Sequence, residues 1–289
     1  MAVVLALLTA ASWGAGDFLG GTAAKRQSIM RVAVGVQVVG VVGLALTMPF
    51  FGAVFSWRDL LIGASAGGAG LLGLMLLYRG LARGPMAVVA PLSALMSATV
   101  PVAWGLANGE RPGWIVASGL VLGLTSIVVI SREPRRATDR QITLEVVGGA
   151  IAAGVGFGLF LVIMSETAEA SAPWPVFGAR AFAVAAALIV VAATGLHVGP
   201  DSVDGSKLSP LRTGDRLVIV MAGICDTAAN VFFLYALERG SLAPVAVLSS
   251  LYPVMTVILA RIVFDEKLDR PKFIGLALAL LAVGLIAGG

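Results

Sequence analysis

Long apolar segments constrain this chain more than any other feature of its sequence. The hydrocarbon core of a bilayer takes about 20 apolar residues per helix. Ten segments of roughly this length follow one another along the 289 residues. They cover about 2–22, 30–50, 60–79, 86–107, 114–131, 144–164, 175–196, 216–237, 243–263 and 272–288. The pattern predicts an all-α integral membrane protein with ten transmembrane helices.

The composition excludes several classes of protein. Hydrophobic residues make up 58% of the chain and charged residues only 12%, against roughly 25% charged residues in soluble domains. A cytosolic enzyme, a disordered chain and a disulfide-stapled secreted domain are therefore excluded. The single cysteine (Cys225) and single histidine (His197) leave no intrachain disulfide or Cys/His zinc site. Hydrolase, metalloprotease and Walker motifs are absent, so we expect no enzyme activity, no ATP hydrolysis and no cofactor.

Small residues indicate how the helices pack. Glycine supplies 36 residues, and glycines four residues apart allow close helix contact in lipid. Such pairs are Gly16/Gly20, Gly63/Gly67, Gly119/Gly123 and Gly154/Gly158. They predict a compact bundle.

Basic residues predict an orientation in the membrane. Of the 20 Lys and Arg residues, 16 lie between an odd-numbered segment and the next, and three (Arg58, Arg111 and Arg239) lie on the other side. Because cytoplasmic loops are rich in Lys and Arg, this distribution places both termini outside the cell. We expect the host to be the inner or plasma membrane.

The second half of the sequence repeats the first. With a shift of 156 residues, 83–95 and 239–251 share 8 of 13 residues, and Glu110 aligns with Glu266. A shift of 142 aligns six residues of 10–19 with 152–161. We therefore expect two five-helix repeats, 1–142 and 143–289. Because five is odd, the second repeat is inverted, an arrangement that allows alternating access to a central site.

Several motifs resemble those of a known family. They are Trp13-Gly14 with Asp17-Phe18, Arg83-Gly84-Pro85 before Val89-Ala90-Pro91-Leu92, Glu110, Arg239-Gly240-Ser241 before Ser249-Ser250-Leu251-Tyr252-Pro253, and Glu266. The whole chain resembles the drug/metabolite transporter superfamily in its EamA-type ten-helix form. The resemblance implies a secondary transporter, often an exporter, that moves small organic solutes between the two halves. It also implies cytoplasmic termini, opposite to the charge distribution, so both orientations stay open.

Asp226 is the first candidate for a functional group inside the membrane. A central aspartate costs about 2.5–3.5 kcal/mol to insert, so it should face the bundle interior or water. Asp226 is our candidate proton-coupling residue, and Asn230 lies one turn further on the same face. The alternative is a buried carboxylate that only bonds a neighbouring helix.

Asp17 and Arg180 are the other charged candidates. Trp13 lies one turn from Asp17, and an acid beside an aromatic ring would suit a cationic or amine-bearing solute. Alternatively, Asp17 is solvated near the interface or pairs with Lys25 or Arg26. Arg180 is a counter-ion for Asp226 or Asp17, a ligand for a substrate carboxylate, or a side chain that reaches back to the interface.

Polar residues also lie beside prolines in the fourth and ninth segments. Ser93 and Ser97 are one turn apart, Ser249 is the repeat mate of Ser93, and Tyr252 precedes Pro253. Prolines free backbone carbonyls, which lipid tolerates only against protein or water. We therefore expect these residues to line a substrate cavity, with helix packing as the alternative.

Two further expectations complete the interpretation. Glu110 and Glu266 should cap the N-termini of the fifth and tenth helices. The function expected is secondary active transport of an amino acid, amine or drug-like metabolite, with protons as a coupling ion. The protein would act as a monomer or weak homodimer, its partners being a small-molecule substrate and the lipid bilayer, with no nucleic acid. The alternative is a lipid-handling or structural membrane protein.

Overall fold

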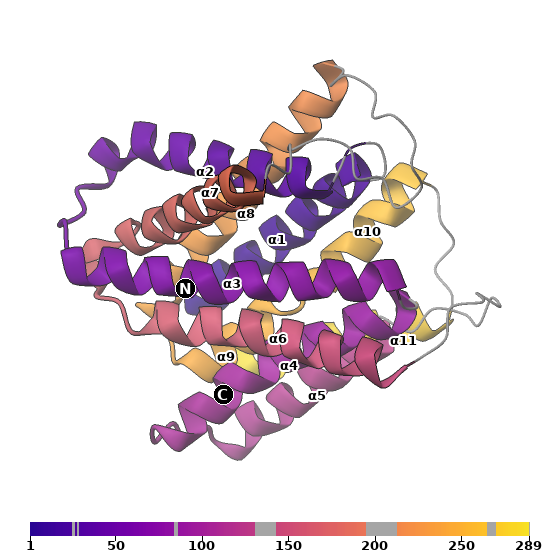
Figure 1. Cartoon of the computed structure of the whole chain (residues 1–289). Coiled ribbons are helices and arrows are strands. Elements are labelled where there is room, and N and C mark those ends of the chain that lie inside the picture. The colour runs from indigo at the N-terminus through magenta and orange to yellow at the C-terminus, as the bar shows by residue number, and fades with distance from the viewer. Residues whose placement is uncertain are drawn as a thin grey trace.

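The structure is a computed structural model that describes residues 1–24, 27, 29–83, 86–130, 143–194, 213–264 and 270–288. This part of the chain is helical and contains no strand (Figure 1). The helices are α1 (Ala2–Ala24), α2 (Ile29–Phe51), α3 (Trp57–Arg83), α4 (Met86–Ala107), α5 (Trp114–Ile130), α6 (Leu144–Ser165), η1 (Glu169–Ser171), α7 (Trp174–Thr194), α8 (Thr213–Leu237), α9 (Leu242–Ser249), α10 (Tyr252–Phe264) and α11 (Arg270–Gly288).

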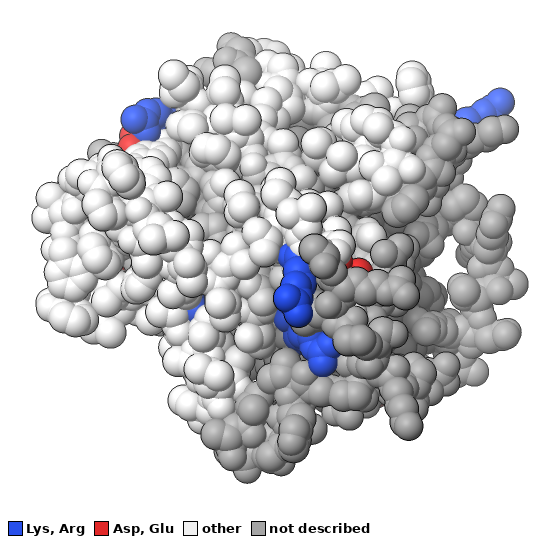
Figure 2. Space-filling view, turned by 90° about the horizontal axis from the view of Figure 1, so that it is seen from above, with Lys and Arg blue, Asp and Glu red and all other residues white. Residues whose placement is uncertain are grey.

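The outer surface of the bundle is apolar. Five described helical segments are long and apolar enough to cross a membrane: Ala2–Gly20, Arg31–Phe51, Trp57–Leu77, Leu144–Ser165 and Gly214–Leu237. Large hydrophobic side chains are exposed along these and the shorter helices, and uncharged residues cover most of the described surface seen from above (Figure 2). Exposed apolar area on this scale requires lipid as the surrounding solvent, which confirms a multi-pass membrane protein.

Four described connections define one end of the bundle, which we call the turn end. They are residues 52–56, 108–113, 166–173 and 238–241, and they lie to the left in Figure 1. Two of them are tied together, because the Val54 amide donates to the Ala170 carbonyl at 2.8 Å and Phe55 packs edge-on against Trp174. These contacts join residues that are more than a hundred positions apart.

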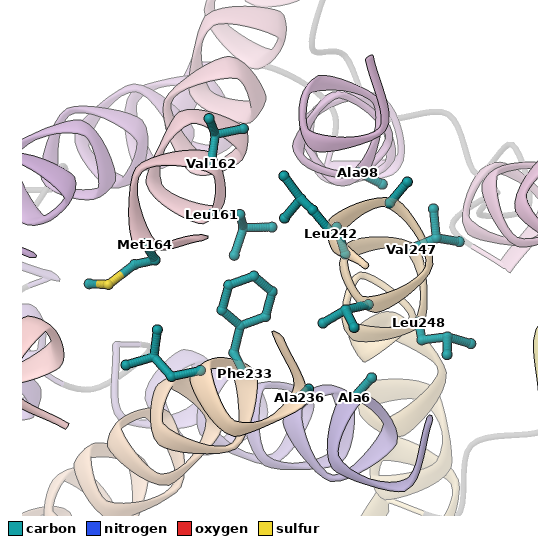
Figure 3. Packing of buried hydrophobic residues seen from close by; sticks show 14 of the residues in the cluster. Ala6, Ala98, Leu161, Val162, Met164, Phe233, Ala236, Leu242, Val247 and Leu248 are labelled. Carbon is teal, nitrogen blue, oxygen red and sulfur yellow. The ribbon is translucent and has the colours of Figure 1, made fainter. Parts of the chain in front are cut away.

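The buried apolar residues are distributed unevenly between the two ends. One large cluster joins both halves of the sequence next to the turn end, around the fully buried Phe233 ring, which points toward Leu161 (Figure 3). Toward the opposite end, the described residues form two separate small clusters. One joins α1, α2 and α8 around Ala23 and Ile219, and the other joins α6 with α3 and α4 around Val146. In the described part of the chain, the apolar core is thus continuous at the turn end and divided into two clusters at the other.

Glycines bring the helix backbones into contact, as the sequence predicts. Gly63 and Gly67 of α3 lie directly against the backbone of α7 at Pro175 and Ala179, leaving no room for a Cβ atom. The pairs Gly154/Gly158 and Gly119/Gly123 likewise face neighbouring helices. Gly16 meets α8, but a Cβ at Gly20 would have no neighbour within 4 Å. The prediction of close packing is confirmed except at Gly20.

The predicted continuous helix over 243–263 is wrong, because the structure has two helices, α9 and α10, separated at Ser250 and Leu251. At the break, two backbone hydrogen bonds join residues three positions apart instead of four. The Leu251 amide donates to the Leu248 carbonyl, and the Val254 amide donates to the Leu251 carbonyl. Pro253 has no amide proton and cannot donate the helical hydrogen bond to the Ser249 carbonyl, which explains the interruption.

The predicted role of Glu110 is also corrected. Its carboxylate accepts hydrogen bonds from the backbone amides of Leu242 at 2.6 Å and Ala243 at 3.1 Å, so it caps α9 and not the fifth helix. The side chain of Ser241, the residue before α9, makes no capping bond. Gly105 makes room for the carboxylate, because a Cβ there would lie 2.7 Å from Glu110 Oε2. Glu266 lies outside the described residues.

We expect the Glu110 cap to stabilise the folded protein. Replacing Glu110 with alanine leaves two buried amides of α9 without their acceptor and should destabilise the protein by about 1 kcal/mol. A lowered melting temperature in detergent would report this loss. Glu166→Ala is the matched control, since its exposed side chain at the same end should be dispensable. Equal melting temperatures for the two variants would contradict a stabilising cap.

Candidate functional site

A buried ion pair between Arg180 and Asp226 forms the centre of the candidate site. Arg180 lies on α7 and Asp226 on α8, and Arg180 Nη1 pairs with Asp226 Oδ2. The Arg180 side chain is 7% exposed, whereas that of Asp226 is 29% exposed. The structure therefore pairs Arg180 with Asp226, which is one of the alternatives that the sequence left open.

Further hydrogen bonds hold the Arg180 guanidinium. Its Nη1 donates to Gln37 Oε1 of α2 at 2.5 Å, and its Nη2 donates to the backbone carbonyl of Asp226 at 3.1 Å. Because removing one partner of a buried ion pair strands a charge, these three acceptors matter for stability. Together they join α7 to α8 and to α2, which lies in the other half of the sequence.

Two residues of the site escaped the sequence analysis. Gln37 is the one amide side chain within an otherwise apolar segment, and that isolation was the available signal. Thr227 lies behind Arg180 with a buried hydroxyl that has no partner among the described groups. Gly40 of α2 packs against both Thr227 and Arg180. A Cβ atom at position 40 would lie 2.6 Å from Thr227 Oγ1 and 3.2 Å from Arg180 Cδ.

Asn230 lies beside the ion pair but bonds within its own helix. Its Nδ2 donates to the Asp226 carbonyl at 2.7 Å, and the side chain is buried. The Asp226 carbonyl therefore accepts from both Asn230 and Arg180. This geometry gives Asn230 a role in orienting the ion pair.

Asp17 lies close to Asp226, on a face of α1 that changes character along its length. Ala6, Ala10, Trp13 and Asp17 follow a spacing of four, three and four residues and so share one face of the helix. Ala6 and Ala10 are buried, Trp13 is half-buried, and Asp17 is exposed. The charges of Asp17 and Asp226 are near enough to interact. The face is thus closed toward the turn end and open at Asp17.

Two aromatic residues flank this acidic pair. The Trp13 ring packs against Phe233 with centroids 6.1 Å apart. Tyr252, the first residue of α10, lies close enough to Asp17 for an electrostatic interaction. Its backbone carbonyl abuts Gly14, where a Cβ would be 2.5 Å away. The helix break therefore brings α10 against α1 next to Asp17.

The three serines lie in helix contacts. Ser93 and Ser97 of α4 are buried, and the Ser97 hydroxyl donates to the Ala94 carbonyl at 2.9 Å. Ser249 is fully buried at the end of α9, and its hydroxyl has no partner among the described groups. The structure therefore brings together Trp13, Asp17, Arg180, Asp226, Asn230 and Tyr252, and it places the serines in the packing around them.

The comparisons with known proteins agree with this architecture. Residues 146–288 match the model of the EamA-like transporter family. No curated protein matches the chain. A solved structure described only as "Crystal structure of protein" superposes with a TM-score of 0.75 and 19% sequence identity, covering 98% of this chain and 95% of the other. That likeness concerns the fold alone.

The packing around Arg180 generates a prediction with a built-in control. Gly40→Val should push Thr227 and Arg180 aside and destabilise the protein by about 1–3 kcal/mol. Gly43→Val, one turn away on the same helix, enters open space, because no atom lies within 4 Å of its Cβ. Melting temperatures of the two variants in detergent make the comparison. A similar loss for both would indicate a general intolerance of α2 to valine and contradict the specific contact.

Proposed function

We propose that the protein is a secondary active transporter of a small organic solute, as the match of residues 146–288 to the EamA-like transporter family suggests. The solute class is an amino acid, an amine or a drug-like metabolite, and export is the proposed direction. The observation that carries the proposal is a charged cluster of Asp17, Arg180 and Asp226 inside an apolar bundle, in which Arg180 is buried and Asp17 is exposed. Charged groups inside a membrane mark solute or ion pathways.

The proposal includes ten membrane crossings, with α9 and α10 sharing one of them. The crossings form two inverted repeats, 1–142 and 143–289, and the family match at 146–288 lies within the second. The helix pairings support this division. Three helix pairs make the most extensive contacts: α1 with α8, α5 with α11, and α3 with α6. The first and the third of these pairs exchange under the proposed two-fold rotation that relates the halves. The contact between α5 and α11 maps onto itself.

Glycine contacts support the same symmetry at the level of single residues. Gly14 of α1 abuts the Tyr252 carbonyl and Met255, and Gly154 of α6 abuts the Ser93 carbonyl and Met96. Two residues on, Gly16 faces α8 and Gly156 faces α3. These structural pairs correspond to a shift of 140 residues (154 − 14), whereas the sequence identities in the same helices correspond to a shift of 142, so the contacts support the pairing of the helices but differ from the sequence alignment by two residues.

The distribution of apolar packing among the described residues supports an opening at one end. The large cluster around Phe233, the Glu110 cap and the Val54 contact all close the turn end. At the opposite end the two small clusters are separate, and Asp17 is exposed on a face that points into the bundle. In an alternating-access cycle the two halves would exchange these arrangements.

Asp226 is the proposed proton-coupling residue. Its partly exposed carboxylate can meet a proton from the open end, while its buried partner Arg180 is held by Gln37. Protonation would remove the charge that holds Arg180 and loosen the contact between α7 and α8. The coupling ion would thereby change the packing of the helices that line the site.

Accessibility of single cysteines tests alternating access. In a Cys225→Ala background, Gly20→Cys should react with a membrane-impermeant thiol reagent from one face only. Ala6→Cys should react slowly, and from the other face, because it is buried until the closed end opens. Leu8→Cys, on the lipid-facing side of α1, is the control expected to stay unreactive. Complete protection of Ala6→Cys from both faces under all conditions would contradict alternating access and favour the lipid-handling or structural alternative.

The proton proposal has its own test. A metabolite panel screened by thermal shift would first identify a solute, since a ligand of the native state raises the melting temperature. Flux of that solute into proteoliposomes should depend on pH for the unmodified protein and lose that dependence in Asp226→Asn. Glu166→Gln, at an exposed position, provides the matched carboxylate control. Unchanged pH dependence in Asp226→Asn would remove Asp226 from the coupling mechanism.

A further inference from the structure

We infer that the site accepts cations, and that a protonated amine or other positively charged group of the solute binds at Asp17. This inference rests on the proposed transport function and specifies its substrate class. It follows from how the three charged side chains of the site are partnered, since Arg180 and Asp226 form an ion pair with each other and Asp17 is the most exposed of the three.

The Arg180 guanidinium contacts three acceptors within the protein. Arg180 directs one terminal nitrogen to Asp226 and Gln37 and the other to the Asp226 carbonyl. Its side chain is almost completely buried, behind Asp226 and against Gly40. A solute carboxylate would have to displace these acceptors to reach the guanidinium. Arg180 is therefore a positioning residue for Asp226 and not a ligand for anions.

Among the described charged residues of the site, the negative charge exceeds the positive charge by one; Lys25 and Arg26, the alternative partners of Asp17, lie outside the described residues. Asp17 and Asp226 contribute two carboxylates, and Arg180 neutralises only Asp226 because the pair is in direct contact. Asp17 is the exposed member and lies near enough to Asp226 for the two to repel each other. A cation between the open end and Asp17 would relieve this repulsion, whereas an anion would increase it.

The aromatic neighbours favour the same class of solute. Trp13 lies on the face of α1 that carries Asp17, one turn deeper, and Tyr252 approaches from α10. Aromatic faces attract ammonium and guanidinium groups, with more effect where water is excluded. An acid at the mouth and aromatic rings below it suit a solute with a cationic head and an apolar body.

The local potential can be measured without knowing the solute. Gly20 lies one turn beyond Asp17 and has open space for a side chain. In a Cys225→Ala background, Gly20→Cys would be modified with methanethiosulfonates that carry either a trimethylammonium or a sulfonate group. The rate at which each reagent modifies the protein is divided by its rate with a small free thiol in solution. The ratio of the normalised rate of the cationic reagent to that of the anionic reagent reports the electrostatic potential at the thiol. Gly148→Cys, another open position on α6, is the control site.

We expect the cationic reagent to react faster with the Gly20→Cys thiol. Adding Asp17→Asn should lower the ratio at this thiol by about fivefold. Removing one negative charge at roughly 8 Å in water slows the cationic reagent and speeds the anionic one, and the two effects multiply in the ratio. The same substitution should leave the ratio at the Gly148→Cys thiol unchanged. A ratio of one or less, or a ratio unaffected by Asp17→Asn, would overturn the inference by showing that Asp17 is already neutralised. Lack of reaction with both reagents from both faces would instead contradict the proposed pathway itself.

Discussion

The ion pair between Arg180 and Asp226 is the interaction on which the interior of this bundle depends. Lipid offers no partner to a charge, so a guanidinium in the middle of an apolar helix must be neutralised inside the protein. Arg180 meets this requirement with a side chain and a carbonyl from α8 and an amide oxygen from α2. The register of α2, α7 and α8 is thereby set by polar contacts, in helices whose apolar surfaces would tolerate sliding. Gly40 completes the arrangement by leaving space where these helices meet.

The two ends of the bundle differ because different forces act at them. At the turn end, apolar burial around Phe233 combines with directed hydrogen bonds, of which the Glu110 cap on α9 is the clearest. At the opposite end the described apolar contacts stay within two separate groups of helices. Under the two-fold relation that we propose between the halves, either end of the bundle could be the closed one. The asymmetry then belongs to one of the two conformations of the proposed cycle.

Much of the fold was predictable because lipid imposes a simple rule. Apolar length alone located the helices, and glycine spacing identified several of the close contacts, such as Gly63 and Gly67 against α7. The break between α9 and α10 was missed, since hydropathy does not register a loss of backbone hydrogen bonds at Pro253. The sequence did not predict that Glu110 caps α9. A carboxylate in a loop is expected to cap the helix that follows it, whereas tertiary packing brings the N-terminus of α9 to Glu110. Of the site, the charged residues were visible as rare charges in apolar segments, but their pairing depends on helix rotation, which nearly uniform apolar helices do not encode.

The short helix α9 connects the closed end to the candidate site. Glu110 holds its N-terminus, and only eight residues later the chain breaks and Tyr252 begins α10 beside Asp17. A helix of eight residues spans about 12 Å, so a displacement at its capped end is carried to the break with little loss. Nearly all of α9 is buried, which leaves it no freedom to bend independently of its neighbours. A carboxylate of the first half thus fixes the position of a second-half element that contacts the acidic site. Any rearrangement that opens the turn end must move α9, and with it the residues around Asp17.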